Sequence, residues 1–177
     1  MKKLFSLAVL SLMSCAAAQA QQFQAQESLF VAKVQRVTLE PRGGQYCPDR
    51  CAANGRRNPD GSTQVCIAND GGCEKTEFVV EKVLFGDMLP GPRTLDSRIG
   101  EWGGTHFPVT HASILVHLKP GVIEWAPVTV KDGQALVQVN KFQRGGTVNG
   151  LDLRSLAQAD GDGVPLDALA EQLSGQR

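Results

Sequence analysis

The sequence has 177 residues, with 18 basic and 18 acidic side chains and a formal net charge of zero at pH 7. It contains no run of like charge and no basic stretch interleaved with aromatic residues, which argues against nucleic acid as a partner. No apolar segment approaches the roughly 20 residues of a transmembrane helix, so we expect one globular domain and no transmembrane segment.

The first twenty residues have the pattern of a secretory signal peptide. Lys2 and Lys3 form a charged start, residues 4–13 form a short apolar stretch, and Ala18-Gln19-Ala20 is a small-residue cleavage site. Removal of residues 1–20 leaves 16 basic and 18 acidic side chains, a net charge of −2. We expect an exported protein, periplasmic or secreted, whose single domain spans residues 21–177.

Cys15 provides an alternative to this cleavage. Leu12-Met13-Ser14-Cys15 resembles a bacterial lipobox, in which the cysteine becomes the lipidated first residue. The bulky Met13 fits that pattern poorly, whereas Ala-Gln-Ala fits ordinary signal peptidase well. Cleavage after Ala20 is the favoured prediction, and a membrane-anchored lipoprotein is the alternative.

The first predicted strand spans residues 27–39, where apolar and polar residues alternate with an irregularity that a β-bulge would explain. The second spans residues 76–86 and is rich in β-branched and aromatic residues. Gly86-Asp87 and Pro90-Gly91-Pro92 end it with turn chemistry.

Residues 41–74, between these strands, form a glycine-rich insertion that contains all four cysteines of the mature chain: Cys47, Cys51, Cys66 and Cys73. An even number of cysteines in an exported protein predicts two disulfide bonds, and three pairings are open. The alternative is a four-thiolate zinc site, although the spacings are longer than those of a zinc knuckle. No C-x-x-C motif supports a redox role.

Four further strands are predicted over residues 93–98, 112–118, 122–130 and 134–142. Lys131-Asp132-Gly133 separates the last two, and Asp-Gly is a strong hairpin signal. Residues 151–177 form a helical tail, because Leu166, Leu169, Ala170 and Leu173 follow Pro165 at helical spacing. The prediction is a mostly β fold, a small five- to six-stranded barrel, closed or nearly closed, with a C-terminal helix.

Three short patterns resemble the netrin-like and tissue-inhibitor-of-metalloproteinase-like domains. They are SLFVAKVQRV, F-x-V-x-x-V-L-x-G over residues 78–86, and ASILV over residues 112–116, within residues 27–140. The resemblance implies a Greek-key barrel of the oligosaccharide/oligonucleotide-binding (OB) type and an exported bacterial protein. The family's inhibitors chelate zinc through an amino-terminal cysteine, whereas Gln21 begins the mature chain here, so that mechanism does not carry over.

The histidines and acidic clusters do not form a recognisable metal site in the sequence. His111 and His117 would lie on one strand face about 20 Å apart, too far to share a metal, and surface histidines are the expected arrangement. Asp160-Gly161-Asp162-Gly163 half-fits a calcium loop, but Pro165 occupies the glycine position of that motif, so we interpret it as a turn. We therefore expect no metal, no cofactor and no catalytic residue.

Trp102 is the best candidate contact residue, because Gly100, Gly103 and Gly104 flank it. It could equally plug one end of the barrel. The predicted function is an exported, non-enzymatic protein-binding or inhibitor-like module that uses the cysteine insertion and the Trp102 loop. The alternatives are an envelope lipoprotein with a structural or assembly role, anchored through Cys15, and a metal-binding protein.

Overall fold

The computed structural model describes residues 26–49, 59–62, 71–100, 103–142, 146–157 and 163–175. These described residues form nine strands, two short 3₁₀ helices and one α-helix. The strands are β1 (Ser28–Pro41), β2 (Gly72–Phe85), β3 (Gly91–Ile99), β4 (Ser113–Lys119), β5 (Val122–Lys131), β6 (Gln134–Val137), β7 (Thr147–Val148), β8 (Leu151–Asp152) and β9 (Val164–Pro165). The helices are η1 (Val139–Lys141), η2 (Leu153–Leu156) and α1 (Leu166–Ser174).

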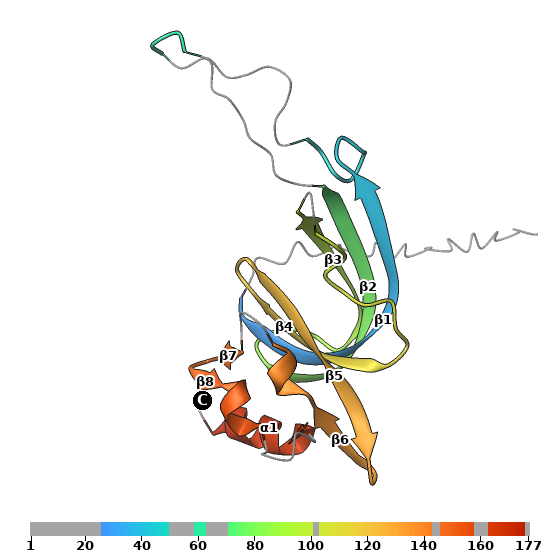
Figure 1. The fold of residues 1–177 in the computed structure, drawn as a ribbon, viewed down its shortest axis with the longest axis vertical. Coiled ribbons are helices and arrows are strands. Elements are labelled where there is room, and N and C mark those ends of the chain that lie inside the picture. Colours follow the sequence, from blue (N-terminus) through green and yellow to red (C-terminus); the bar gives the residue numbers. More distant parts are fainter. Residues whose placement is uncertain are drawn as a thin grey trace, which may run out of the picture.

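Seven strands form one antiparallel sheet in the order β3-β2-β1-β4-β5-β6-β9, and β7 pairs with β8 in a separate hairpin. The mostly β prediction and the C-terminal helix are confirmed. All six predicted strand segments correspond to β1–β6, although β6 ends at Val137 and η1 follows it. Figure 1 shows α1 and the β7–β8 hairpin at one end of the sheet, while the chain after β1 leaves at the opposite end.

β1 is the irregular strand that its sequence predicts. Its pairing register with β2 shifts at three places, between Leu29 and Phe30, between Val31 and Ala32, and between Val34 and Arg36. Bulges of this kind increase the local bend of a strand. They let β1 pair with β4 through residues 28–33 and with β2 along its whole length.

The predicted β5–β6 hairpin is confirmed, and its turn has the backbone conformation that an Asp-Gly sequence favours. Lys131 pairs with Gln134, and the two residues between them have positive φ, 51° at Asp132 and 79° at Gly133. Positive φ at both central residues matches the right-handed twist of the flanking strands. The local sequence is therefore enough to determine this turn.

The expected barrel closure is corrected by the strand pairing. A barrel requires its two edge strands to pair, whereas β3 pairs only with β2 and β9 only with β6, and no closed barrel is found among the described residues. β5 pairs with β4 through residues 122–127 and with β6 through residues 128–131, so the sheet continues away from β3. Residues 103–112 lead from β3 to β4 without joining the sheet.

The inner face of the bent sheet encloses the first of two hydrophobic cores. We call it the inner core, and three of its aromatic rings, Phe30, Phe78 and Phe107, stack in succession at centroid distances of 5.7 and 6.2 Å. Phe107 comes from the segment between β3 and β4, so that segment closes one side of the core. The other buried members are Ala32, Val34, Val80, Met88, Leu95, Ile114, Val116 and Leu118.

The second core lies on the opposite face, beneath α1, and we call it the helix core. Leu166, Leu169 and Leu173 project from α1 at the predicted helical spacing and are buried. They pack with residues from β1, β2, β4–β6 and the C-terminal turns, among them Leu29, Val31, Leu84, Leu115, Phe142 and Leu153. Within the residues that the structure describes, no helix has the length and apolarity needed to cross a membrane.

Candidate functional site

The outer face of β1, β2 and β3 is polar at the end farthest from α1. Cross-strand pairing arranges nine side chains there in three rows. We call this surface the charged face. Its rows are Arg36, Glu77 and Thr94; Thr38, Lys75 and Asp96; and Glu40, Cys73 and Arg98. It contains three cationic and three anionic side chains, so the face is neutral overall.

A disulfide bond ties the start of the insertion to this face. Cys47 bonds to Cys73 of β2 across 26 residues of sequence, with their Cα atoms 5.4 Å apart. This pairing was one of the three that the sequence left open. The backbone of Gly43 donates a hydrogen bond to the carbonyl of Cys47 at 2.9 Å, and the backbone of Cys47 donates to that of Gly44 at 3.2 Å. We call residues 42–49 the tethered loop.

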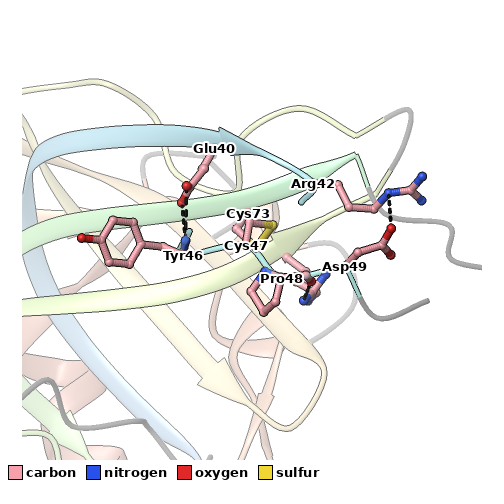
Figure 2. Close-up of a disulfide and its surroundings, with 8 residues drawn as sticks. Glu40, Arg42, Tyr46, Cys47, Pro48, Asp49 and Cys73 are labelled. Atoms are coloured by element: carbon pink, nitrogen blue, oxygen red, sulfur yellow. Dashed lines mark hydrogen bonds and ion pairs between the residues drawn. A yellow bond between two sulfur atoms is a disulfide. The ribbon is translucent and has the colours of Figure 1, made fainter. Parts of the chain in front are cut away.

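Side chains fasten the tethered loop at both ends, as Figure 2 shows. The carboxylate of Glu40 accepts a hydrogen bond from the backbone N–H of Tyr46, with both oxygens 3.2 Å from the nitrogen. On the other side of the disulfide, Arg42 lies 3.8 Å from the carboxylate of Asp49. Arg98 of β3 donates to the carbonyl of Pro48 at 2.7 Å. The loop is therefore held to both β2 and β3.

Tyr46 is the exposed residue that this fastening presents. Its side chain is 75% exposed, and the ammonium of Lys75 lies 6.0 Å from the centre of its ring. A cleft of about 630 Å³ lies beside it, lined by members of the charged face. A tyrosine held with its ring exposed beside polar groups can bury the ring against a partner and hydrogen-bond through its hydroxyl.

Arg36 and Glu77 form the best-defined ion pair of the charged face. The guanidinium donates to both carboxylate oxygens, at 3.2 and 2.6 Å. The hydrogen bond to Arg36 lowers the pKa of Glu77, and the same bond, with the charge of Glu77, raises the pKa of Arg36. Both groups are solvent-accessible, so this pair orients the side chains more than it stabilises the fold.

A buried carboxylate lies on the inner side of the same strands. Glu74 is fully buried, and its carboxylate accepts hydrogen bonds from the Thr76 hydroxyl at 2.8 Å and from the backbone N–H of Phe107 at 3.2 Å. The backbone N–H of His106 and its Nδ1, at 3.2 Å, complete the set. Glu74 therefore holds the segment between β3 and β4 against the end of the inner core.

The environment of Glu74 keeps the carboxyl ionised. Burial raises its pKa, but the hydrogen bonds from His106, Thr76 and Phe107 together outweigh burial, and the pKa lies below its ordinary value. Ser97 Oγ also lies 3.2 Å from His106 Nδ1, the same ring nitrogen that faces Glu74. A serine–histidine–acid relay uses the two different ring nitrogens, so this cluster does not have relay geometry.

His117 departs from the surface position that the sequence analysis expected, and that prediction is wrong for this residue. The side chain is fully buried on β4, because the helix core covers that face of the strand. Nε2 lies 2.9 Å from Glu27 Oε1, and the ring meets Phe142 edge-on at 6.3 Å. The other oxygen of Glu27 accepts from the backbone N–H of Asn149 at 3.2 Å.

Of the residues that the sequence singled out, the structure brings together Cys47 and Cys73. Trp102, Cys15, Cys51, Cys66 and the acidic cluster around Asp160 lie outside the described residues. No group of three or more metal-ligating side chains occurs within the described ranges. Tyr46 and Glu74 were not predicted as site residues from the sequence. Tyr46 is the only tyrosine of the chain and directly precedes Cys47, a signal that could have identified it.

Comparisons with known proteins find no match for this chain. No family model matches it, and searches of curated proteins and of solved structures find no significant match. The function must therefore be argued from the site alone.

Proposed function

We propose that the chain is an exported, non-enzymatic protein-binding module, and that it contacts its partner through Tyr46 and the charged face. One observation carries the proposal. A disulfide and a carboxylate hydrogen bond hold Tyr46 with three quarters of its side chain exposed, next to a cleft. Tyrosine is one of the residues that contribute most to protein interfaces, and a backbone that is already held in place loses less entropy on binding.

The charge pattern favours a protein over a nucleic acid as the partner. Three cations and three anions alternate across the charged face, whereas a phosphate backbone needs an excess of cations. Arg36 and Glu77 neutralise each other, which leaves a mixed polar surface of the kind found at the rim of a protein interface. The disulfide supports an oxidising compartment and hence the export that the signal sequence predicts.

The histidine geometry supports a non-enzymatic role. His106 meets both Glu74 and Ser97 through Nδ1 alone, and His117 is buried without access to a substrate. Among the described residues, neither His106 nor His117 has a nucleophile on one ring nitrogen and an acid on the other.

Site-specific photo-crosslinking in the producing cells tests the proposal. A photoreactive residue at position 46 should give a discrete crosslinked species, whereas the same residue at Val130 should not. Val130 is a matched control because it is 74% exposed and lies on β5, outside the tethered loop and charged face. Identical products at both positions, or none at position 46, would contradict the proposal.

The crosslinked partner, once identified, allows a quantitative test. Tyr46→Ala should weaken binding of the purified partner by roughly 30-fold, the effect of losing an interface anchor, while Tyr46→Phe should retain most of the affinity. Equal affinities for wild type and Tyr46→Ala would exclude Tyr46 as the contact residue.

A further inference from the structure

A second crevice, which shares Ser97 and Arg98 with the cleft beside Tyr46, lies between β3 and the turn that joins β4 to β5. Its volume is about 300 Å³, at the lower end of the range for ligand sites. Met88, Leu95 and Leu118 line it and are buried, and Val122 and Ile123 line it from β5. These side chains form an apolar surface of the size that accommodates one apolar side chain of a ligand.

The polar lining of this crevice favours an anion. Arg98, Lys119 and His106 line it, and none of its lining residues is an aspartate or glutamate. Lys119 has no ion-pair partner among the described residues. An apolar lining with an unpaired ammonium is complementary to a carboxylate attached to an apolar group.

β3 adds a means of holding the rest of such a ligand. It pairs with β2 on one side only, and in the described part of the chain no strand covers its other edge. Leu95 and Ser97 of β3 line the crevice, so a chain paired along this edge would pass beside the apolar surface. Addition of a strand to a free sheet edge is a recurring mode of peptide recognition, and main-chain hydrogen bonds supply its affinity.

We propose that this crevice binds the carboxyl-terminal residue of an extended partner peptide. The peptide pairs with the free edge of β3, its last side chain packs against Met88, Leu95 and Leu118, and its terminal carboxylate lies beside Lys119. The site is distinct from Tyr46, and the inference does not rest on the function proposed above.

The test is a titration of the ¹⁵N-labelled full chain with a defined peptide, acetyl-Gly-Ser-Thr-Leu with a free carboxylate, followed by NMR. We expect saturable shifts of the amides of Leu95, His106, Lys119 and Ile123. The same peptide with an amidated end should bind at least about tenfold more weakly, because the charge-assisted contact is lost. Replacement of the last leucine by serine or aspartate should also weaken binding.

Lys119→Gln should abolish the preference for the free carboxylate without unfolding the chain, because Lys119 makes no ion pair in the described structure. Lys131→Gln is the matched control, since both lysines end a strand just before a two-residue turn. It should retain the preference, and Tyr46→Ala should leave peptide binding unchanged.

Three results would overturn the inference. They are the absence of saturation at millimolar peptide, equal binding of the acid and the amide, and shifts confined to another surface. Hexanoate is a further test ligand, because it has a carboxylate and an apolar group but no peptide backbone. If hexanoate binds as tightly as the peptide, the crevice recognises small amphiphilic acids, and the proposed peptide pairing with β3 is wrong.

Discussion

The molecule contains two carboxylate–histidine pairs whose burial is reversed. In the Glu74–His106 pair the carboxylate is fully buried and the histidine side chain is 29% exposed. In the Glu27–His117 pair the histidine is fully buried and the carboxylate is 27% exposed. Each pair joins a segment outside the main sheet to the sheet, the β3–β4 connection in the first and the β7–β8 turn in the second.

In each pair, the buried partner is the one whose loss of hydration must be compensated by hydrogen bonds. Glu74 cannot be hydrated, so each of its hydrogen bonds compensates for burial, and four donors are present. Glu27 remains in contact with water, and His117 keeps one nitrogen, Nδ1, without a partner among the described residues. We therefore expect the fold to depend strongly on Glu74 and weakly on the polarity of His117.

The largest expected effect comes from Glu74→Ala. The substitution leaves the buried Thr76 hydroxyl and the backbone N–H of Phe107 without an acceptor, so the free energy of unfolding should fall by about 3–5 kcal/mol. Urea unfolding followed by circular dichroism measures the change. A loss no larger than that of Glu77→Gln, a solvent-accessible carboxylate on the same strand, would contradict the central role of Glu74.

The pH dependence of stability tests the ionisation of Glu74. Because its folded pKa is lower than its unfolded pKa of about 4.3, the carboxylate contributes stability that is fully present well above that pH and is lost as the pH falls through the folded pKa. Glu74→Gln has no carboxylate at this position, so it should not lose this part of the free energy of unfolding at acidic pH. The difference in the free energy of unfolding between wild type and Glu74→Gln should therefore become smaller as the pH falls. A gap that stays constant between neutral and acidic pH would show that folding does not lower the pKa of Glu74, and a gap that widens as the pH falls would show that folding raises it.

The second largest effect comes from the disulfide that neighbours Glu74. Replacing Cys47 and Cys73 together by serine removes a constraint across 26 residues, which should lower the free energy of unfolding by about 3 kcal/mol. The double variant is preferable to chemical reduction, because a reductant would act on every disulfide of the chain. If its unfolding midpoint equals that of wild type, the tethered loop does not contribute to the stability of the Glu74 end.

A smaller effect is expected at the other pair. His117→Leu keeps an apolar side chain of similar size against Phe142 and leaves Glu27 in contact with solvent, so the cost should be below about 1 kcal/mol. His117→Ala should cost more, about 2–3 kcal/mol, because it opens a cavity in the helix core. A larger loss for leucine than for alanine would show that the Glu27 hydrogen bond, rather than packing, holds this region.

The smallest effect belongs to the charged face. Arg36→Gln removes a solvent-accessible ion pair with Glu77 and should produce no resolvable change in the unfolding midpoint. A clear destabilisation would mean that the charged face is part of the folding core, and would weaken its assignment as a binding surface.

Local patterns predicted the elements of this fold well. Alternation identified the six strands, Asp132-Gly133 identified the hairpin, and the leucine spacing identified α1. These features depend on residues close in sequence, so local sequence patterns are enough to predict them. The sequence left open whether the barrel is closed or only nearly closed, because closure depends on whether two edge strands distant in sequence meet. β5 instead continues into its pairing with β6, and no closed barrel is found among the described residues.

Glu74 shows most clearly what local sequence patterns cannot predict. Every second residue of β2 from Glu74 to Val80 is buried on the same face of the strand. The predicted strand began at Thr76, so Glu74 was placed in the preceding loop. Even with the correct strand start, nothing near Glu74 in sequence indicates its partners, since His106 lies 32 residues away. The same holds for His117, whose partner Glu27 is 90 residues away.

The strands, the turns, the helix and the cysteine-rich insertion could all be predicted from the amino-acid sequence, because each follows from periodicity, composition or turn chemistry among neighbouring residues. The pairing of Cys47 with Cys73, the burial of Glu74 and His117, and the exposure of Tyr46 beside the charged face became apparent from the three-dimensional structure. Burial depends on which distant segments cover a side chain. Here residues 103–112 cover Glu74, and the helix core beneath α1 covers His117.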